Sequence, residues 1–334
     1  MNPVKVGLIG YGLSGKVFHA PFFRTLPEYE LQLVSTSKPE NVHADMENVK
    51  VVPTPEEVID SDQVELVVIT APNEYHFSLG KQALEAGKHV VIEKPFVVHS
   101  EEGEALMKLA EEKGLVLSPY HNRRWDNDFL TVRKLIESGA LGEVMSYEAH
   151  FDRYRPNVRD RWREKPVPGG GILFDLGSHL IDQALQLFGN KPKHVGADVK
   201  AQREDATVDD YFHLRLDYDP LQVILHSSAL VRSPGPRFQV HGTKGSFVKY
   251  GTDPQESQLR EGKMPRSTGW GLDQEQTYGI LTNDEYTDGK RIMTETGQYE
   301  AYYEQIFESI RNGAPLPVTA QQGTDVIRII EACK

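Results

Sequence analysis

The sequence feature that most constrains the fold is a short β-rich run leading directly into closely spaced glycines. The run VKVGLIG ends at Gly10, and Gly12 and Gly15 follow before a helical pattern that continues to about Leu26. A strand, a glycine turn and a helix in this order begin a dinucleotide-binding domain. Gly10 permits the tight turn, Gly12 lets the backbone approach a pyrophosphate, and Gly15 lets helix and strand pack closely. The alternative is a plain turn between two ordinary elements.

Further β-rich runs alternate with helical patterns, which predicts a parallel sheet with crossover helices. The runs are LQLVSTS, VELVVITAP and KHVVIEKP, and the helical pattern HFSLGKQALEAG ends in a glycine. Ligands bind beyond the carboxyl ends of parallel strands, so the residues that follow these runs should face the cofactor. These residues are Thr70, Pro72, Asn73, Glu93 and Lys94.

The end of the second β-rich run lacks the acidic residue that normally binds the ribose hydroxyls of NAD. Ser35, Thr36, Ser37 and Lys38 stand there instead. Hydroxyl donors with one cation suit the 2′-phosphate of NADP. We therefore expect NADP as the cofactor, with NAD as the second candidate, and a solvated polar turn is the alternative interpretation.

Length and charge exclude several classes of protein. A chain of 334 residues predicts two domains, and 37 basic against 49 acidic residues argue against a nucleic-acid surface. The single cysteine, Cys333, cannot form an internal disulfide or a zinc cluster. No cleavable leader pattern begins the chain, and no apolar run approaches the roughly 20 residues that span a bilayer. We expect a cytoplasmic protein with no membrane partner.

The stretch GGGILFDLGSHLIDQ carries a polar stripe through an apolar helical pattern. Asp175, His179 and Asp182 follow at spacings of four and three residues, so they share one helix face. Without context, such a histidine is usually a satisfied core residue. No second His or Cys stands at zinc-ligand spacing, so we expect no metal. Asp182 is interpreted as a structural partner.

Together these motifs resemble a known family. GYGLSGKVFHAP, IEKPFVV and FDLGSHLIDQ resemble the family of glucose–fructose oxidoreductase, inositol dehydrogenase and MocA, and the likeness spans nearly the whole chain. YHNRRWDNDFLT, RYRPNVRDRWRE and DYFHLRLDY look like its branch of NADP-dependent scyllo-inositol dehydrogenases. The resemblance implies an α/β chain. A Rossmann NAD(P)-binding domain over residues 1–122 would precede an α+β domain over 123–334, with an open, mostly antiparallel sheet for substrate binding and oligomer contacts.

Local patterns agree with a second domain of this kind. GEVMSYEAHFD, HVGADVKAQ, DYFHLRLDY, LQVILHSSALV and RFQVHGTKGSFVKY are β-like and separated by turn signals. Residues 254–297 are expected to be loop with short structure. Two helices, near Tyr299–Asn312 and Ala320–Cys333, should pack near the first domain. Chains of the family usually continue further, so truncation after Lys334 is a further expectation.

The resemblance implies that Lys94, Asp175 and His179 are catalytic. Histidine has an ordinary pKa near neutrality, so His179 is suited to take the hydroxyl proton when a secondary alcohol is oxidised. Asp175, one turn earlier, would orient the imidazole or the substrate. Lys94 would hydrogen-bond the reacting oxygen, unless it is an ordinary lysine at a strand end. The glycines Gly169–Gly171 would let the chain approach the nicotinamide closely.

The remaining predicted site residues surround this group. The cofactor set comprises Gly10, Gly12, Leu13, Ser14, Gly15, Ser35, Thr36, Ser37, Lys38, Thr70, Pro72, Asn73, His76, Glu93, Lys94 and Asn122. The substrate set comprises Tyr120, Arg123, Tyr154 and Trp162, which would surround a polyol with donors and an aromatic wall. The arginines of the Arg153–Arg163 stretch have an alternative interpretation, in which they pair with Asp152, Asp160 or Glu164 as solvated charge.

The sequence thus predicts an NADP-dependent dehydrogenase acting on a secondary hydroxyl or ketone of a cyclic polyol or sugar, with scyllo-inositol the sharpest candidate. The expected assembly is a homodimer or homotetramer. One alternative is a cofactor-binding sensor without catalysis, since fold alone does not prove chemistry. Another is a reductase of a different carbonyl compound.

Overall fold

The computed structural model describes residues 2–333, which divide into two compact units. The first unit runs to Asn122 and also includes Gln255–Trp270 and Gln298–Thr324. The second comprises Arg123–Pro254, Gly271–Gly297 and the residues from Asp325 onward. The first unit therefore gains two later segments that the boundaries 1–122 and 123–334 assigned to the second domain. Composition alone did not reveal them, because chain order does not record which later helix returns to an earlier core.

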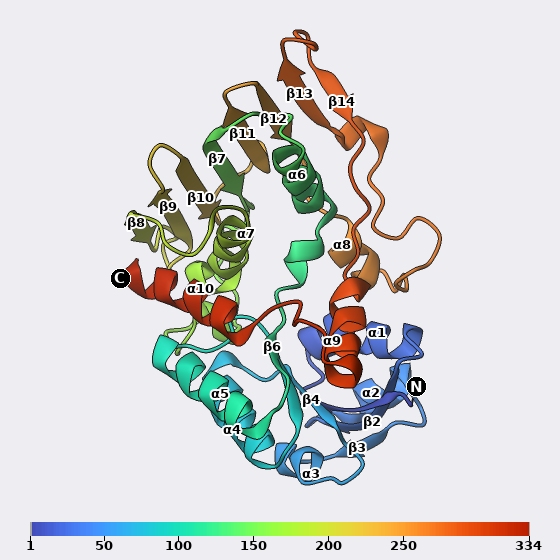
Figure 1. Cartoon of the computed structure of the whole chain (residues 1–334). Coiled ribbons are helices and arrows are strands. Elements are labelled where there is room, and N and C mark those ends of the chain that lie inside the picture. The colour runs from blue at the N-terminus through green and yellow to red at the C-terminus, as the bar shows by residue number, and fades with distance from the viewer. Residues whose placement is uncertain (1, 334) are drawn as a thin grey trace. The chain divides into compact units, whose positions relative to one another are not determined.

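The first unit contains a six-stranded parallel sheet (Figure 1). Its strands are β1 (Val4–Ile9), β2 (Tyr29–Ser35), β3 (Lys50–Val52), β4 (Leu66–Ile69), β5 (His89–Ile92) and β6 (Leu117–Pro119). The order β3-β2-β1-β4-β5-β6 is that of the doubly wound dinucleotide-binding sheet. All four residues of β4 are buried, which explains why this strand is apolar throughout rather than alternating.

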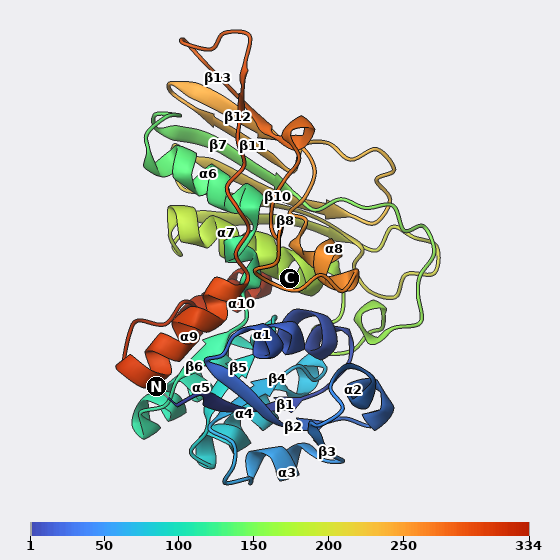
Figure 2. The ribbon, with the colours of Figure 1, turned by 90° about the vertical axis from the view of Figure 1, so that its right-hand side faces the viewer.

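Helices lie on both faces of this sheet (Figure 2). They are α1 (Ala20–Thr25), α2 (Pro39–Asp45), α3 (Pro55–Ile59), α4 (His76–Glu85) and α5 (Ser100–Lys113). Two later helices, α8 (Gln255–Arg260) and α9 (Glu300–Asn312), belong to the same unit, and α8 packs on the turn Ser14–His19. Helix α5 ends at Gly114, whose φ of 63° is the left-handed conformation common after helices. The predicted helix at Tyr299–Asn312 is confirmed as α9. Its packing with the first unit agrees with the expectation for the two closing helices, although the boundary at residue 122 had assigned it to the second domain.

Aromatic side chains hold α9 to the first unit. The Tyr303 ring lies 4.8 Å from Phe23 and 5.5 Å from Tyr29 between centroids, in edge-to-face contacts. The Tyr29 hydroxyl donates to the Tyr303 carbonyl at 2.6 Å. Edge-to-face pairs stabilise beyond the burial of their area. These contacts fix a segment almost 300 residues away in sequence against the first helix and second strand.

The second unit contains an eight-stranded sheet that is mostly antiparallel, as predicted. The strands are β7 (Val144–His150), β8 (His194–Lys200), β9 (Tyr211–Asp217), β10 (Gln222–Ser228), β11 (Phe238–Gly242), β12 (Gly245–Lys249), β13 (Gly279–Asn283) and β14 (Lys290–Ile292). Their order is β14-β13-β12-β11-β7-β10-β9-β8, and β7 and β10 pair in parallel, so the sheet is mixed. Phe212, Leu214 and Leu216 of β9 are buried while His213 and Arg215 are exposed, so one face is covered.

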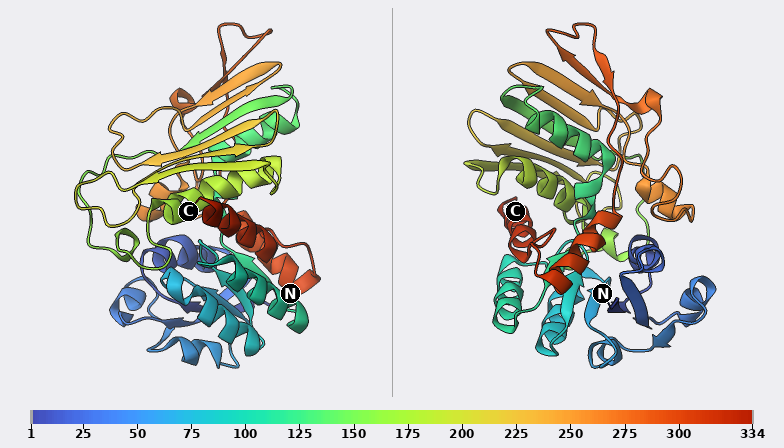
Figure 3. Two further views of the ribbon diagram at one scale, coloured as in Figure 1. Left: turned by 90° about the vertical axis from the view of Figure 1, so that its left-hand side faces the viewer. Right: turned by 45° about the vertical axis from the view of Figure 1, so that its right-hand side comes forward.

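Helices α6 (Asn127–Glu137) and α7 (Ser178–Phe188) cover that apolar face (Figure 3). Tyr147 of β7 meets Phe188 of α7 with ring centroids 5.3 Å apart. Helix α10 (Ala320–Ala332) begins in the first unit and belongs to the second from Asp325 onward. Within residues 2–333, no helix is long and apolar enough to cross a bilayer.

Candidate functional site

The glycine turn after β1 has the local geometry predicted for it. Gly10 has a φ of 95°, and its N–H donates to the Ser35 carbonyl at 2.9 Å. A Cβ on Gly15 would lie 2.3 Å from the Gly10 carbonyl oxygen, so this position requires glycine for packing. A Cβ on Gly12 would meet no atom within 4 Å. The space beside Gly12 thus fits the close approach of a pyrophosphate.

A π-helical turn, Ser14–His19, follows Leu13 and leads into α1. Such turns are rare and occur often at functional sites. The His19 ring is completely buried within 3.0 Å of a Glu93 carboxylate oxygen, and its other ring nitrogen faces the Tyr303 hydroxyl at 2.5 Å. The turn is therefore anchored to the end of β5.

Glu93 is the charged centre of this arrangement. Its carboxylate accepts hydrogen bonds from the Ser14 hydroxyl and from the Lys94 backbone N–H, the latter at 2.8 Å. Burial alone would raise the pKa of Glu93, but the hydrogen bond and charge of His19, with Lys94 and Ser14, lower it to about 2. Glu93 is therefore ionised near neutrality. It fixes the half-buried residue Lys94 directly after β5.

The polar residues predicted at the adenosine ribose lie in the turn after β2. Ser35 is buried, and its carbonyl is used by Gly10. The Thr36 hydroxyl accepts a hydrogen bond from the Lys38 backbone N–H at 3.2 Å, whereas Ser37 and Lys38 are exposed. One cation and two hydroxyls at an exposed strand end are compatible with a 2′-phosphate.

Three more residues of the cofactor set support the turn. The Thr70 hydroxyl lies 2.9 Å from the Gly10 carbonyl, to which it donates. The His76 ring is completely buried, with its nitrogens 2.8 and 3.0 Å from the carbonyls of Pro95 and Ala71, and burial lowers its pKa. Asn73 is also buried. His76 thus joins the β4 and β5 ends, a role that its sequence position did not reveal.

Pro72 and Asn122, the remaining members of the cofactor set, stand at the starts of two short 3₁₀ turns. Pro72 precedes the turn Asn73–Tyr75 and is exposed. Asn122 begins the turn Asn122–Trp125 and is buried.

Tyr120 was predicted to contact substrate, but the structure places it inside the first unit. Its hydroxyl donates to the Phe18 carbonyl at 2.8 Å, and its ring packs 4.3 Å from His19 and 4.8 Å from Tyr302 between centroids. Only 1% of the residue is exposed. Burial, with nearby Glu93, raises the pKa of Tyr120 well above its ordinary value. The aromatic pattern predicted a ligand wall, whereas the return of α9 makes it a core residue.

The second unit contains another glycine-rich turn, Gly169–Gly171, which also leads into a π-helical turn, Leu173–Gly177, and then α7. Gly171 has a φ of 94°, and a Cβ there would lie 2.0 Å from an Asp209 carboxylate oxygen. Asp209 accepts a hydrogen bond from the Leu173 N–H at 2.7 Å. The positive φ and the crowding by Asp209 therefore explain why residue 171 is glycine, without any ligand beside it.

Asp175 lies in the π-helical turn, where two arginines surround it. Its carboxylate is 3.4 Å from the Arg163 Nε and 3.9 Å from an Arg153 terminal nitrogen. The side chain is partly exposed and lines a hollow that opens to solvent. The hollow is lined by Arg153, Arg155, Arg161, Arg163, Glu164, Gly171, Ile172, Asp175, Arg203, Asp209, Asp210 and Ala229.

His179 follows on α7 and is buried, with 5% of the residue exposed. Asp182, three residues later, forms a bidentate pair with Arg124, with nitrogen–oxygen distances of 2.9 and 2.6 Å. Both partners of that pair are buried. The interpretation of Asp182 as a structural partner is confirmed. Asp175 lies in the π-helical turn and His179 four residues later in α7, so the shared α-helical face stays a prediction.

The other members of the predicted substrate set lie in the second unit. Arg123 pairs with Asp126 at 3.3 Å and stacks on Phe151. Tyr154 is 42% exposed, with an arginine guanidinium 4.0 Å above its ring. Trp162 is half-buried beneath the guanidinium of the following residue. Tyr154 and Trp162 thus lie in the same loop as the arginines of the hollow.

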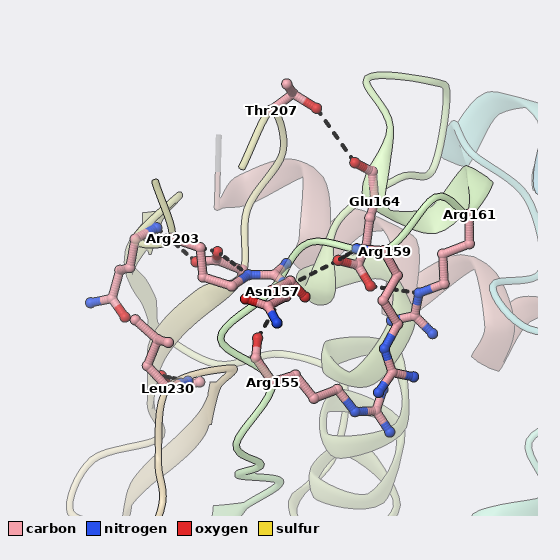
Figure 4. Close-up of polar contacts among 11 residues, drawn as sticks. Arg155, Asn157, Arg159, Arg161, Glu164, Arg203, Thr207 and Leu230 are labelled. Atoms are coloured by element: carbon pink, nitrogen blue, oxygen red, sulfur yellow. Dashed lines mark hydrogen bonds and ion pairs between the residues drawn. The ribbon is translucent and has the colours of Figure 1, made fainter. Parts of the chain in front are cut away.

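The structure partly resolves the alternative interpretation of those arginines (Figure 4). Glu164 accepts from Arg161 at 2.6 Å and from Arg203 at 2.9 Å, so it holds two guanidinium groups. Asp160 pairs with Lys165 instead of an arginine. Asp152 lies beside two histidines. Pairing with the predicted carboxylates therefore accounts for part of the arginine charge.

Those histidines form a cluster that sequence reasoning missed. His150 of β7 and His226 of β10 are paired in the strand register, and both lie within 3.5 Å of an Asp152 oxygen. Their ligand atoms and that of Asp152 all lie within 4.8 Å of one another, the separation of a three-ligand metal group. Sequence reasoning searched for ligands only near His179, and strand register alone brings residues 150 and 226 together.

Comparisons with known proteins agree with this architecture. Residues 4–121 match the model described as oxidoreductase family, NAD-binding Rossmann fold, and residues 133–334 match the C-terminal alpha/beta domain of the same oxidoreductase family. The chain is 50% identical to scyllo-inositol 2-dehydrogenase (NADP(+)) IolW of Bacillus subtilis, over 99% of this chain and 93% of that protein.

Two further matches span almost the full chain. The oxidoreductase YdgJ of Escherichia coli, described as uncharacterized, is 45% identical over 98% of this chain and 94% of its own. The solved structure of yvaA from Bacillus subtilis superposes with a TM-score of 0.96 at 50% identity, covering 99% of this chain and 95% of the other.

Proposed function

Because the chain belongs to the Gfo/Idh/MocA family of oxidoreductases and is a dehydrogenase of CH–OH groups, we propose that it transfers hydride between NADP and a cyclic polyol or sugar. The observation that carries the finer proposal is its 50% identity, over nearly the full chain, to an enzyme named for scyllo-inositol and NADP(+). The open space beside Gly12 and the exposed Lys38 also support it.

A bound nicotinamide supplies the hydride acceptor or donor. We assign the proton chemistry to the chain's own side chains. His179, which is buried, takes the hydroxyl proton as the alcohol is oxidised, since an imidazole nitrogen is a suitable general base. Asp175 orients the substrate or the imidazole, and Lys94 donates a hydrogen bond to the reacting oxygen.

Other proposed contacts follow from exposure. Tyr154 and Trp162 offer an aromatic surface in the loop that carries arginines of the hollow, and Arg123 stays a proposed substrate contact although its side chain pairs with Asp126. Tyr120 is left out, because its hydroxyl is committed to the Phe18 carbonyl. In the turn of the first unit, Leu13 and Ser14 complete the phosphate-binding backbone.

The test is a coupled set of kinetic and binding measurements. Wild-type protein with NADP⁺ and scyllo-inositol should produce reduced nicotinamide, measured by its absorbance. His179→Asn should lower turnover by roughly 10²–10⁴ while NADP affinity is unchanged. His213→Asn, at an exposed position of β9, is the matched control and should keep full activity. Equal turnover in the His179 variant would contradict its role, and cofactor binding without turnover of any polyol would indicate a sensor.

Cofactor preference has its own test. Lys38→Glu places a carboxylate where NAD-binding domains carry one, so it should repel the 2′-phosphate and accept ribose hydroxyls. We expect the ratio of kcat/KM for NADP⁺ to that for NAD⁺ to fall at least about tenfold, corresponding to 1.4 kcal/mol. An unchanged ratio would contradict the assignment of Lys38.

A homodimeric or homotetrameric state and a cytoplasmic location stay predictions. Light scattering after size-exclusion chromatography tests the oligomeric state.

A further inference from the structure

The hollow beside Asp175 contains more positive charge than its own carboxylates neutralise. Five of its lining residues are arginines, and four are acidic. Asp209 accepts a hydrogen bond from the backbone of the π-helical turn, and burial raises its pKa. Asp210 and Glu164 both bind Arg203, and Glu164 also binds Arg161. The ion pairs among the lining residues therefore do not neutralise every arginine of the hollow.

Among the lining residues the excess guanidinium group is that of Arg155, and the exposed Arg159, which does not line the hollow, adds a second one four residues later. Across residues 2–333, no hydrogen bond or ion pair involves the side chain of Arg155 or of Arg159. Figure 4 shows both guanidinium groups extending to the same side of the loop as that of Arg161. Burial, followed by the charges of Arg159 and Arg161, lowers the pKa of Arg155. Like charges gathered in this way repel one another unless an anion joins them.

The backbone holds these cations in place rather than leaving them on a free loop. The Arg155 N–H donates to the Ala229 carbonyl at 2.7 Å, and the Arg159 N–H donates to Glu164 at 3.0 Å. Arg203, which is buried, also donates to the carbonyls of Arg155 and Asn157. The backbone of the Arg155–Arg159 segment is thus fixed at both ends, at Arg155 by Ala229 and Arg203 and at Arg159 by Glu164. A pair of neighbouring guanidinium groups suits a carboxylate or a phosphate, because each group can donate two parallel hydrogen bonds.

We propose that this hollow is an anion subsite of the substrate site, and that the preferred substrate is a polyol or sugar bearing a carboxylate or phosphate group bound by Arg155 and Arg159. The anion would lie in the same hollow as Asp175, which the proposed function places at the substrate. The identity of the substrate as a polyol rests on that proposed function, whereas anion binding by the two arginines does not.

Binding is tested first, with the full chain and without turnover. Titration calorimetry with inorganic phosphate and with D-glucuronate should show one site on wild-type protein. Arg155→Gln combined with Arg159→Gln should weaken it at least tenfold, and each single variant should weaken it less. Arg133→Gln, on the exposed face of α6, removes the same charge elsewhere and should bind as wild type. The proposal would be overturned if the double variant bound phosphate and glucuronate as tightly as wild type does. It would also be overturned if phosphate were displaced by NADP⁺ and its binding did not depend on the two arginines.

Kinetics then distinguish the two anion sources. Glucose, D-glucuronate and glucose 6-phosphate differ only in the group at C6, so the ratios of their kcat/KM values isolate its contribution. We expect at least one anionic sugar to exceed glucose tenfold in wild type, and that ratio to fall tenfold in the double variant. A neutral sugar used as well as both anionic ones would overturn the proposal. If no sugar is turned over but the arginine-dependent binding remains, the anion subsite stands and the proposed function fails.

Discussion

The glycine turns Gly10–Gly15 and Gly169–Gly171 both precede a π-helical turn, but the spaces beside their glycines differ. At Gly171 the space is filled by the Asp209 carboxylate, 2.0 Å from the position of a Cβ. A Cβ built on Gly12 would have no atom within 4 Å apart from its own chain neighbours. The first turn thus includes a glycine whose space is open to a ligand, whereas Gly171 serves packing within its own unit. Glycine in a motif indicates a close approach, and only the neighbours show what approaches.

A carboxyl group supports each turn, and the pKa values of the two groups shift in opposite directions. Glu93 supports the first turn, and His19 with its other donors lowers its pKa to about 2. Asp209 supports the second, where burial outweighs its backbone hydrogen bonds and raises the pKa. A nearby imidazole stabilises the ionised form of Glu93, and no comparable cation is among the causes of the shift at Asp209.

The largest expected loss of stability is for Gly171→Ala. The φ of 94° strains any residue with a Cβ, and the Cβ would displace Asp209 from the Leu173 N–H. We expect the free energy of unfolding to fall by about 4 kcal/mol, measured by urea denaturation. The control is Gly87→Ala, where φ is 77° but no atom lies within 4 Å, and strain alone should cost about 1–2 kcal/mol. Equal losses at the two positions would mean that crowding by Asp209 is not the reason for glycine.

The ionised Glu93 carboxylate is expected to make a slightly smaller, pH-dependent contribution to the free energy of unfolding. Its folded pKa of about 2 lies below the ordinary 4.5, so its contribution is fully present above pH 4.5 and is lost as pH falls toward 2. A shift of this size corresponds to about 3 kcal/mol. The stability difference between wild type and Glu93→Gln should therefore shrink across that interval, measured by chemical denaturation at several pH values. Glu111→Gln, at an exposed position of α5, should show no such trend, and a constant difference for Glu93→Gln would refute the assignment.

The smallest effect on stability is expected for Gly12→Ala, which separates packing from binding. Because a Cβ there meets no atom, the free energy of unfolding should change by less than about 0.5 kcal/mol. NADP affinity, measured by titration, should fall at least about tenfold if the open space belongs to the pyrophosphate. Gly15→Ala, whose Cβ would lie 2.3 Å from a backbone oxygen, should instead lose about 1–3 kcal/mol of stability. Unchanged NADP affinity in Gly12→Ala would show that the open space beside Gly12 does not receive the pyrophosphate.

Much of the fold could be predicted because its signals are local. Short β-rich runs between helical patterns indicated the parallel sheet, and the glycine spacing placed the first turn. The family resemblance and the β-like segments separated by turn signals indicated the sheet of the second unit. The spacing of Asp175 and His179 predicted their shared helix face. Tyr120 and His76 were harder, because whether a ring faces a ligand or the core depends on which distant segment covers it. Helix α9 covers Tyr120, and the Pro95 carbonyl binds His76.

The sequence by itself determined the alternation of strands and helices in the first unit, the glycine turn and the family, since each is written in short local motifs. The tertiary structure decided which arginines of the Arg153–Arg163 loop are neutralised. Glu164 binds Arg203, a residue 39 positions away, while Arg155 and Arg159 have no ion-pair partner within residues 2–333. Charge balance in a site is a property of groups brought together by folding, because Coulomb energy depends on distance in space and not along the chain.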